Sequence, residues 1–194
     1  RLLAELLTVD RRPQTEAPLA FDAIVGRNAL TRHPDKPAAA RLLSGLLSEL
    51  GVISLAETVP QHTQRLVDLI DPTSLGAELT AELRQAEEAI YHRDDDSMVN
   101  WDEHALRAAF EAAGLAAEVA VEREASDLQV TPAVLARWFS PSADPARPSY
   151  ADHLGRKLDD AARSTVEAAF RKQLNNRVLS WGTTTAYLLS LIHI

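Results

Sequence analysis

Two short apolar runs with a helical pattern between them stand near the start of the chain. Phe21 to Val25 stops at Gly26 and predicts a buried strand. From Ala40 to Leu50 the apolar residues recur at helical spacing, and Gly51 stands where a helix end favours glycine. Val52 to Ala56 is a second apolar run. A strand, a helix and a strand in this order predict a right-handed βαβ unit in a parallel sheet.

The remaining pattern predicts mostly helices, with two further strands. Helical periodicity and cap signals predict helices over residues 61–70, 75–91, 100–114, 131–139, 150–158 and 160–174. Apolar and charged residues alternate from Ala117 to Glu124, which is typical of a strand with one face in water, and Thr183 to Leu188 predicts a last strand. This order predicts an α/β fold: the C-terminal half of a doubly wound sheet with helical insertions and an antiparallel edge strand.

Both ends of the chain carry signals of their own. Within residues 1–7 apolar side chains recur at helical spacing, at Leu2, Leu3, Leu6 and Leu7, and predict the end of a helix that begins further upstream. Leu189 to Ile194 matches the codons CTG TCT CTT ATA CAC ATC, which end a transposon used to prepare sequencing libraries. We therefore expect residues 189–194 to be a sequencing-adapter artefact, the alternative being a genuine apolar C-terminal strand.

Composition narrows the possible partners. The 194 residues include 20 Lys and Arg against 28 Asp and Glu, a net charge of −8. This acidic balance argues against a nucleic-acid surface or an anionic membrane as the main partner, because both are bound through excess positive charge. The absence of cysteine excludes disulfides, Cys-ligated zinc and thiol nucleophiles, and favours a reducing compartment, so we expect a cytoplasmic location.

Several motifs of known chemistry are missing from the sequence. The 7 glycines form neither a dinucleotide-binding fingerprint nor a phosphate loop, so the segment alone holds no complete nucleotide site. The 6 histidines never lie three or four residues apart, which excludes a helical metal pair. Glu87, Glu88 and Asp94 to Asp96 form an acidic cluster, which we interpret as a solvated helix end rather than a metal site.

Two longer stretches carry a resemblance to a known family. FDAIVGRNAL at residues 21–30 and GVISLAETVP at residues 51–60 resemble the fourth and fifth strands of a class I, S-adenosylmethionine-dependent methyltransferase. The segments AEEAIY, MVNWD, LRAAFEAAG, RWF and RPSYADHL resemble a methyltransferase-like region that some bacteria fuse to a replication-associated recombination protein A, a RarA-type AAA+ ATPase. The similarity covers nearly all of residues 18–188.

The resemblance implies a Rossmann-like sheet and a partial domain over residues 1–188, whose first three βα units lie upstream. At about 30 residues for each unit, roughly 90 residues of that domain are missing. The S-adenosylmethionine site would therefore be incomplete here. Ligands of such sheets lie outside the carboxyl ends of the strands, which implies that Gly26, Arg27 and Asn28 are cofactor-binding residues.

The same edge of the sheet holds the candidates for catalysis, Glu57 and His62. Glu57 is a candidate base or acceptor clamp, and the alternative is a carboxylate that caps the next helix. His62 carries an imidazole, a common general base, or is a surface histidine. Arg27 binds a carboxylate or is a solvated strand-end arginine, and Asn28 binds ligand or is a turn residue that tolerates left-handed backbone.

Three functions follow as hypotheses. The first is a fragment of a methyltransferase that transfers a methyl group to an unknown acceptor, the fragment itself being inactive. The second is a non-catalytic methyltransferase-fold module that serves a fused or partner AAA+ ATPase in DNA replication and recombination. The third is a stand-alone α/β binding domain. None of them requires a direct nucleic-acid or membrane surface on this segment.

Overall fold

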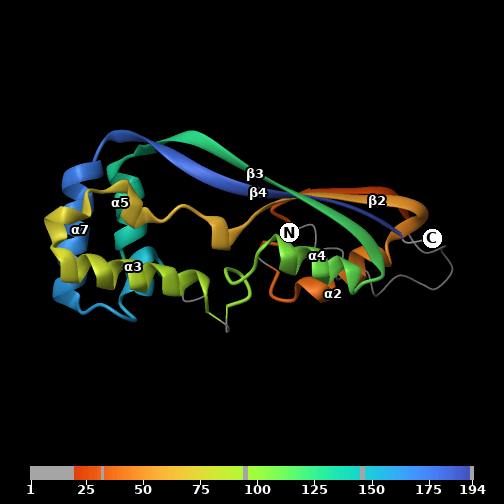
Figure 1. The fold of residues 1–194 in the computed structure, drawn as a ribbon, viewed down its shortest axis with the longest axis horizontal. Helices are drawn as coiled ribbons and strands as arrows, with labels where there is room; N and C mark the ends of the chain where they lie inside the picture. Colours follow the sequence, from red (N-terminus) through yellow and green to blue (C-terminus); the bar gives the residue numbers. More distant parts are fainter. Residues whose placement is uncertain (1–19, 32, 94–95, 145–146, 193–194) are drawn as a thin grey trace. The chain divides into compact units, whose positions relative to one another are not determined.

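The computed structural model describes residues 20–31, 33–93, 96–144 and 147–192 (Figure 1). The fold is α/β, with a four-stranded mixed sheet of order β1-β2-β4-β3. By their contacts the residues divide into two compact units: unit 1 is residues 1–59, 101–122 and 185–194, and unit 2 is residues 60–100 and 123–184. The helical prediction for residues 1–7 lies outside the described residues.

Unit 1 contains the βαβ element that the sequence predicts. Its elements are β1 (Phe21–Arg27), α2 (Lys36–Ser44), β2 (Leu47–Thr58), α4 (Glu103–Glu111), the start of β3 (Leu115–Val130) and the end of β4 (Arg177–Ile192). β1 pairs with β2 in parallel, from Ala23 opposite Val52 to Arg27 opposite Ala56. β4 runs antiparallel to β2 and lies between β2 and β3, so the antiparallel strand is internal in this sheet.

Gly51 does not end a helix, and this prediction was wrong. Helix α2 stops at Ser44, Leu46 lies in the turn that follows, and Leu47 and Leu50 belong to β2. A Cβ on Gly51 would stand 2.7 Å from the carbonyl oxygen of Phe21, so glycine is needed where two strands approach closely. The register is also irregular here, because Phe21 faces Leu47 and Ala23 faces Val52. Close strand approach, not capping, accounts for the glycine.

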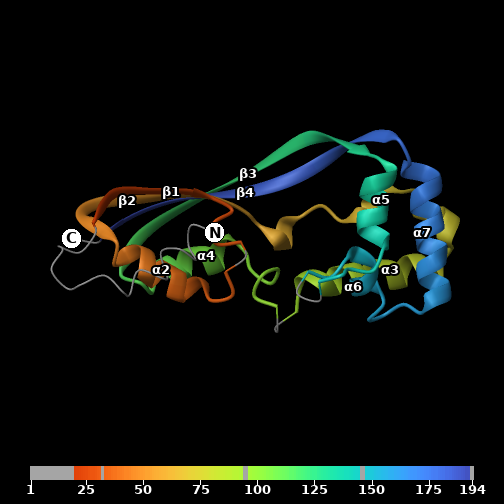
Figure 2. The same ribbon diagram turned by 180° about the vertical axis from the view of Figure 1, so that it is seen from behind.

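One face of the sheet in unit 1 is covered by helices. Helices α2 and α4 contact each other and lie on the same side of β1 and β2 in both views (Figures 1 and 2). Their core has these buried members: Leu30, Ala39, Ala40, Leu43, Leu47, Ile53, Leu55, Val59, Trp101, Leu106, Phe110, Leu115, Ala186 and Leu188. Side chains alternate along a strand, so the opposite face carries the exposed Val25, Tyr187, Leu189 and Leu191. Apolar surface therefore remains on that face among the described residues.

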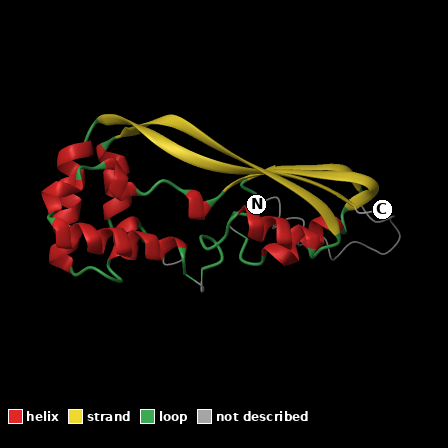
Figure 3. Cartoon of the chain, viewed as in Figure 1, coloured by secondary structure: helices red, strands yellow, loops and turns green. Residues whose placement is uncertain are grey.

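Unit 2 is mainly helical (Figure 3). Its elements are η1 (Pro60–His62), η2 (Leu66–Leu69), η3 (Pro72–Leu75), α3 (Ala77–Tyr91), α5 (Pro132–Phe139), α6 (Tyr150–Leu154) and α7 (Asp160–Leu174), with the remaining parts of β3 and β4. The rings of Phe139, Tyr150 and Phe170 meet with centroids 5.3 to 6.1 Å apart. Such edge and tilted contacts are favoured between aromatic rings, and they join α5, α6 and α7.

Some predicted element boundaries differ from the structure. Residues 61–70 form no α-helix but the two short 3-10 helices η1 and η2. Helix α4 is capped by Asp102, whose carboxylate accepts from the amide of Ala105 at 2.8 Å, and not by Asn100. Residues 189–192 continue β4, as the alternative of a C-terminal strand describes, while the origin of their codons stays a prediction. No described helix is long and apolar enough to cross a membrane.

Candidate functional site

The loop after β1 and the end of β2 meet at one edge of the sheet in unit 1. Because the two strands are parallel, their carboxyl ends lie side by side. Asn28 has a φ of 50°, which is left-handed backbone, and its amide donates to the carbonyl of Ala56 at 2.9 Å. Its side-chain oxygen accepts from the amide of Thr58 at 2.9 Å. Asn28 is thus a turn residue that ties the loop to β2.

Glu57 holds the same loop from the other strand. Its Oε1 accepts from the amides of Ala29 and Leu30 at 2.7 and 3.1 Å. Its Oε2 accepts from the amide and the hydroxyl of Thr31 at 2.9 and 2.8 Å. The residue is fully buried, and successive amides that point at one carboxylate form an anion-binding nest. The carboxylate satisfies these four donors and makes the loop rigid.

Two polar side chains at this edge have binding capacity left. Arg27 is exposed at the end of β1 and forms no ion pair with the described residues. The side-chain nitrogen of the exposed Asn28 likewise donates to none of them. Gly26 has a packing role, since a Cβ there would stand 2.9 Å from Leu55 Cδ2 and 3.1 Å from Ala29 Cβ. The edge therefore offers a guanidinium and an amide on a tightly packed turn.

The structure places four of the five predicted site residues together. Gly26, Arg27, Asn28 and Glu57 lie at the strand ends of unit 1. His62 belongs to η1 of unit 2, where its carbonyl accepts from the Thr184 hydroxyl at 3.3 Å. The ligand and catalytic roles of all five stay predictions. The observed contacts of Glu57 are those of a capping carboxylate, the alternative to a catalytic role. Glu57 caps the turn from Ala29 to Thr31 and not the start of a helix.

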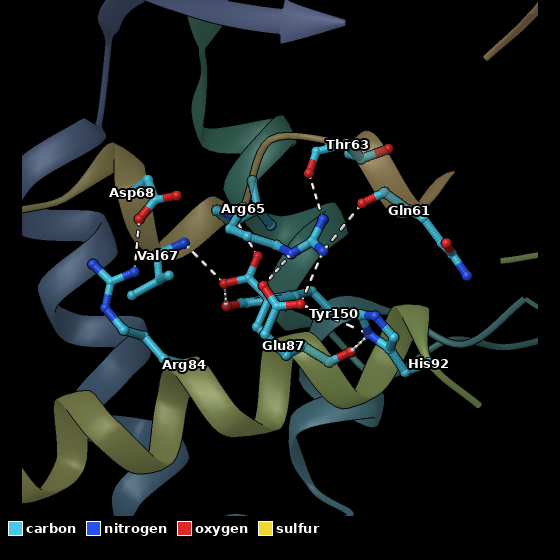
Figure 4. A network of polar contacts seen from close by, with 11 residues as sticks. Gln61, Thr63, Arg65, Val67, Asp68, Arg84, Glu87, His92 and Tyr150 are labelled. Carbon is cyan, nitrogen blue, oxygen red and sulfur yellow. Dashed lines mark hydrogen bonds and ion pairs between the residues drawn. The ribbon is translucent and has the colours of Figure 1, made fainter. Parts of the chain in front are cut away.

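Unit 2 holds a second buried carboxylate, which sequence analysis missed. We interpreted Glu87 as part of a solvated acidic cluster, but it is only 1% exposed. It accepts from the amides of Leu66 and Val67 at the start of η2, the latter at 2.9 Å, and from the Tyr150 hydroxyl at 3.1 Å (Figure 4). A usable signal was its spacing, because Glu87 stands four residues after Leu83 on the apolar stripe of α3.

The surroundings of Glu87 favour its neutral form. Burial raises its pKa from 4.5, against the lowering effect of its hydrogen bonds with Val67, Leu66 and Tyr150 and of the Arg65 charge. The pKa of Tyr150 is also raised well above 10.0, first by burial and then by the nearby carboxylate. This pair therefore resists ionisation, as expected for groups that serve packing and hydrogen bonding within a core.

Arg65 forms the outer layer of the same network. Its guanidinium binds both carboxylate oxygens of Glu88, at 2.7 and 2.9 Å, and lies over the Tyr91 ring at 4.1 Å from the centroid. It also donates to the carbonyls of Thr63 and Gln61 (Figure 4). The guanidinium lowers the pKa of Glu88, chiefly through the hydrogen bonds. Arg65 thus joins η1, η2 and α3.

Comparison with known proteins finds similarity among solved structures alone. No model of a protein family and no curated protein matches the chain. A Bacillus halodurans protein provisionally named a methyltransferase is 9% identical at a TM-score of 0.45, and the match covers 94% of this chain and 68% of that one. YcgJ of Bacillus subtilis is 14% identical at a TM-score of 0.44, with the same coverage.

A third solved structure adds a more distant likeness. It is a Galdieria sulphuraria protein provisionally named a sarcosine dimethylglycine methyltransferase, 14% identical at a TM-score of 0.36. The match covers 91% of this chain and 55% of that one. At these low similarities, the α/β class of the chain rests on its own strands and helices.

Proposed function

We propose that unit 1 is the acceptor-side half of a class I, S-adenosylmethionine-dependent methyltransferase domain. The observation that carries the proposal is the edge formed by β1 and β2, where the loop that follows Arg27 is held by Asn28 and Glu57. A polar, tightly packed loop at the carboxyl end of parallel strands is where α/β sheets bind ligands. The resemblance of residues 21–30 and 51–60 to methyltransferase strands supports the same assignment.

The available groups at this edge fit one end of S-adenosylmethionine. That ligand ends in an amino acid, and the Arg27 guanidinium is suited to its carboxylate because it binds carboxylates in a planar fork. The unused nitrogen of Asn28 is a second donor. When bound, the cofactor supplies an electrophilic methyl group. The residues of this chain would hold and orient its methionine end.

In this proposal Glu57 positions the binding residues and does not contact the ligand. Its oxygens accept hydrogen bonds from the turn between Ala29 and Thr31, so its carboxylate orders the chain directly after Arg27 and Asn28. A direct role as base or acceptor clamp would require release from those donors. His62 belongs to unit 2, and its role as a general base stays a prediction that this proposal for unit 1 does not use.

The test is a calorimetric titration of S-adenosylmethionine into the full-length protein recovered from the source DNA. We expect saturable binding, which Arg27→Gln weakens about tenfold through loss of a charged hydrogen bond. Arg41→Gln is the matched control, because Arg41 is an exposed arginine on α2 of the same unit. Absence of binding to the intact protein, or equal weakening by both variants, would contradict the proposal.

A second candidate is a methyltransferase-fold module without chemistry, attached to a RarA-type AAA+ ATPase. Burial of Glu57 favours it, because the one predicted catalytic carboxylate is fully used inside the fold. Sequencing of the upstream gene distinguishes the candidates. A Walker A motif together with a degraded glycine-rich cofactor turn would support the module, whereas an intact cofactor turn would support the enzyme.

A further inference from the structure

A cavity of about 340 Å³ lies in unit 2, where α3 ends beside α6. Its apolar part comes from α3 and includes Ala89 and Ile90. The size is at the lower end of cavities that hold small organic ligands. None of its residues belongs to the strand-end site of unit 1, so its function is separate from the one proposed above.

The polar part of this cavity is basic. Arg93 stands just after α3, His153 lies on α6, and Arg156 and Lys157 occupy the turn that follows α6. Arg156 and Lys157 are exposed and form no ion pair with any described residue. Three permanent positive charges around one cavity are notable in a chain whose net charge is −8.

Two described acidic groups near the cavity, Asp152 and Asp96, are engaged elsewhere. The carboxylate of Asp152 accepts from the amides of Ser142 and Ser149 at 2.9 and 2.8 Å, which lowers its pKa. The carboxylate of Asp96 accepts from the amide of Met98 at 3.1 Å. These two acids raise the pKa of His153, but burial and then the charge of Arg93 outweigh them and lower it from its ordinary value of 6.5, which favours the neutral imidazole.

His153 adds an unused polar atom. Its Nδ1 is buried and has no hydrogen-bond partner among the described residues. Buried polar atoms are nearly always paired, because an unpaired one forfeits the hydrogen bonds it would make to water. An unpaired ring nitrogen on a residue that lines a basic cavity is consistent with a partner that is not part of the protein.

We propose that this cavity binds a small phosphate monoester with an apolar or aromatic body. The apolar side chains of α3 would contact the body of the ligand, and Arg93, Arg156 and Lys157 would face its phosphate. A phosphate dianion is favoured because guanidinium groups bind its oxygens in a planar fork and an ammonium adds a further charge-assisted contact. An inorganic phosphate ion would leave the apolar side chains of α3 without a contact, so we expect a ligand that also has an apolar body.

The probe is phenyl phosphate, titrated into the chain of residues 1–194 by calorimetry. Inorganic phosphate carries the charge without the ring, and benzyl alcohol carries a ring without the charge. We expect saturable binding of phenyl phosphate that is about tenfold tighter than that of inorganic phosphate, because the ring becomes buried. Benzyl alcohol should show no saturable binding. Equal affinity for the two phosphates, or no binding of phenyl phosphate, would overturn the proposal.

Matched variants locate the binding. Lys157→Gln should weaken phenyl phosphate binding about fivefold, and Arg156→Gln with Lys157→Gln together more than about tenfold. Lys172→Gln should leave binding unchanged, because Lys172 is also exposed and forms no ion pair with a described residue, but lies on α7 and does not line the cavity. Loss of affinity in Lys172→Gln equal to that in Lys157→Gln would show nonspecific ion attraction and contradict the site.

Two further measurements test the cavity itself. Ala89→Leu fills the apolar part and should abolish binding while circular dichroism confirms an intact fold. In nuclear magnetic resonance spectra, the ring signals of His153 should shift on addition of phenyl phosphate, whereas those of the exposed His104 should not. Unchanged His153 signals at saturation would place the ligand elsewhere and overturn the proposal.

Discussion

Units 1 and 2 each bury one glutamate that binds backbone amides, yet the two carboxylates differ in their surroundings. Glu57 stands near the end of a strand and receives four hydrogen bonds from three consecutive residues of one loop. Glu87 stands on a helix and receives three, two from η2 and one from the Tyr150 hydroxyl. One acid organises a single turn, and the other joins three elements.

This difference concerns what each acid can do for the fold. Every donor to Glu57 belongs to the loop that directly follows Arg27 and Asn28, so loss of the carboxylate would affect the predicted binding edge directly. Glu87 lies on α3 and accepts a hydrogen bond from the Tyr150 hydroxyl. Its pKa is raised by burial, so its charged form is poorly solvated. Two carboxylates that are equally buried can therefore contribute to stability in different ways, one mainly through its charge and the other mainly through packing and neutral hydrogen bonds.

The largest effect is expected from Glu57→Ala. Removal of the carboxylate leaves three amides and one hydroxyl without their acceptor, and the free energy of unfolding should fall by about 3 to 4 kcal/mol. Urea unfolding measures it. Glu49→Gln, an exposed glutamate of the same strand, is the control and should change stability by less than about 0.5 kcal/mol. A loss below about 1 kcal/mol in Glu57→Ala would mean that water replaces the carboxylate.

Glu87→Gln should cost about 2 kcal/mol in acid and less at neutral pH. Because the folded protein binds the proton of Glu87 more tightly than the unfolded chain does, the stability that Glu87 contributes is complete below pH 4.5 and is lost as the pH rises through its raised pKa. Urea unfolding from pH 4 to 8 should therefore show the wild type and the variant converging with rising pH. Divergence would contradict a raised pKa.

Tyr150→Phe is expected to be milder, at about 1 kcal/mol, because it removes one donor and keeps the ring. The pKa of Glu87 should rise further, since the Tyr150 hydrogen bond lowers it, and the pH window of the previous experiment should move upward. Tyr91→Phe retains the ring under Arg65 and serves as the control, with no shift of the window. If Tyr150→Phe left this pH range unchanged, the Tyr150 hydroxyl would have no effect on the pKa of Glu87, which would contradict the prediction.

The smallest effect concerns the outer layer. Glu88 is about half exposed, although the Arg65 side chain that it binds is only 14% exposed, so solvent partly screens the pair and Glu88→Gln should cost about 0.5 kcal/mol at low salt. The pKa of Glu88 is lowered, so this contribution should be lost as the pH falls. At 1 M salt the difference should become smaller. A cost above that of Tyr150→Phe would show that Arg65 depends on this pair.

Local signals predicted much of the fold. Helices over residues 131–139 and 160–174 were expected from periodicity and cap signals, and α5 and α7 confirm them, because these signals act within a few residues. The end of α2 was not predictable in the same way. Gly51 fits a cap and a close strand approach equally well in sequence, and only the position of Phe21, 30 residues earlier, decides between them.

The candidate site follows the same rule. Gly26, Arg27 and Asn28 could be placed at a strand end because that inference needs only the strand boundary. The contacts of Glu57 could not be predicted, since its donors lie 26 to 28 residues away and depend on the pairing of two strands. The burial of Glu87 was missed because two neighbouring acids indicated a solvent-exposed helix face. Of the two, only Glu88 is exposed.

Hydrogen exchange of the turn held by Glu57 would also report how often the sheet opens. The amide hydrogens of Ala29, Leu30 and Thr31 are sheltered by a side chain of β2 and not by a neighbouring backbone carbonyl. They can exchange with heavy water only when Glu57 leaves, so their exchange rates report the frequency with which β1 and β2 separate. Three amides outside any helix or strand would then exchange as slowly as the paired strand itself.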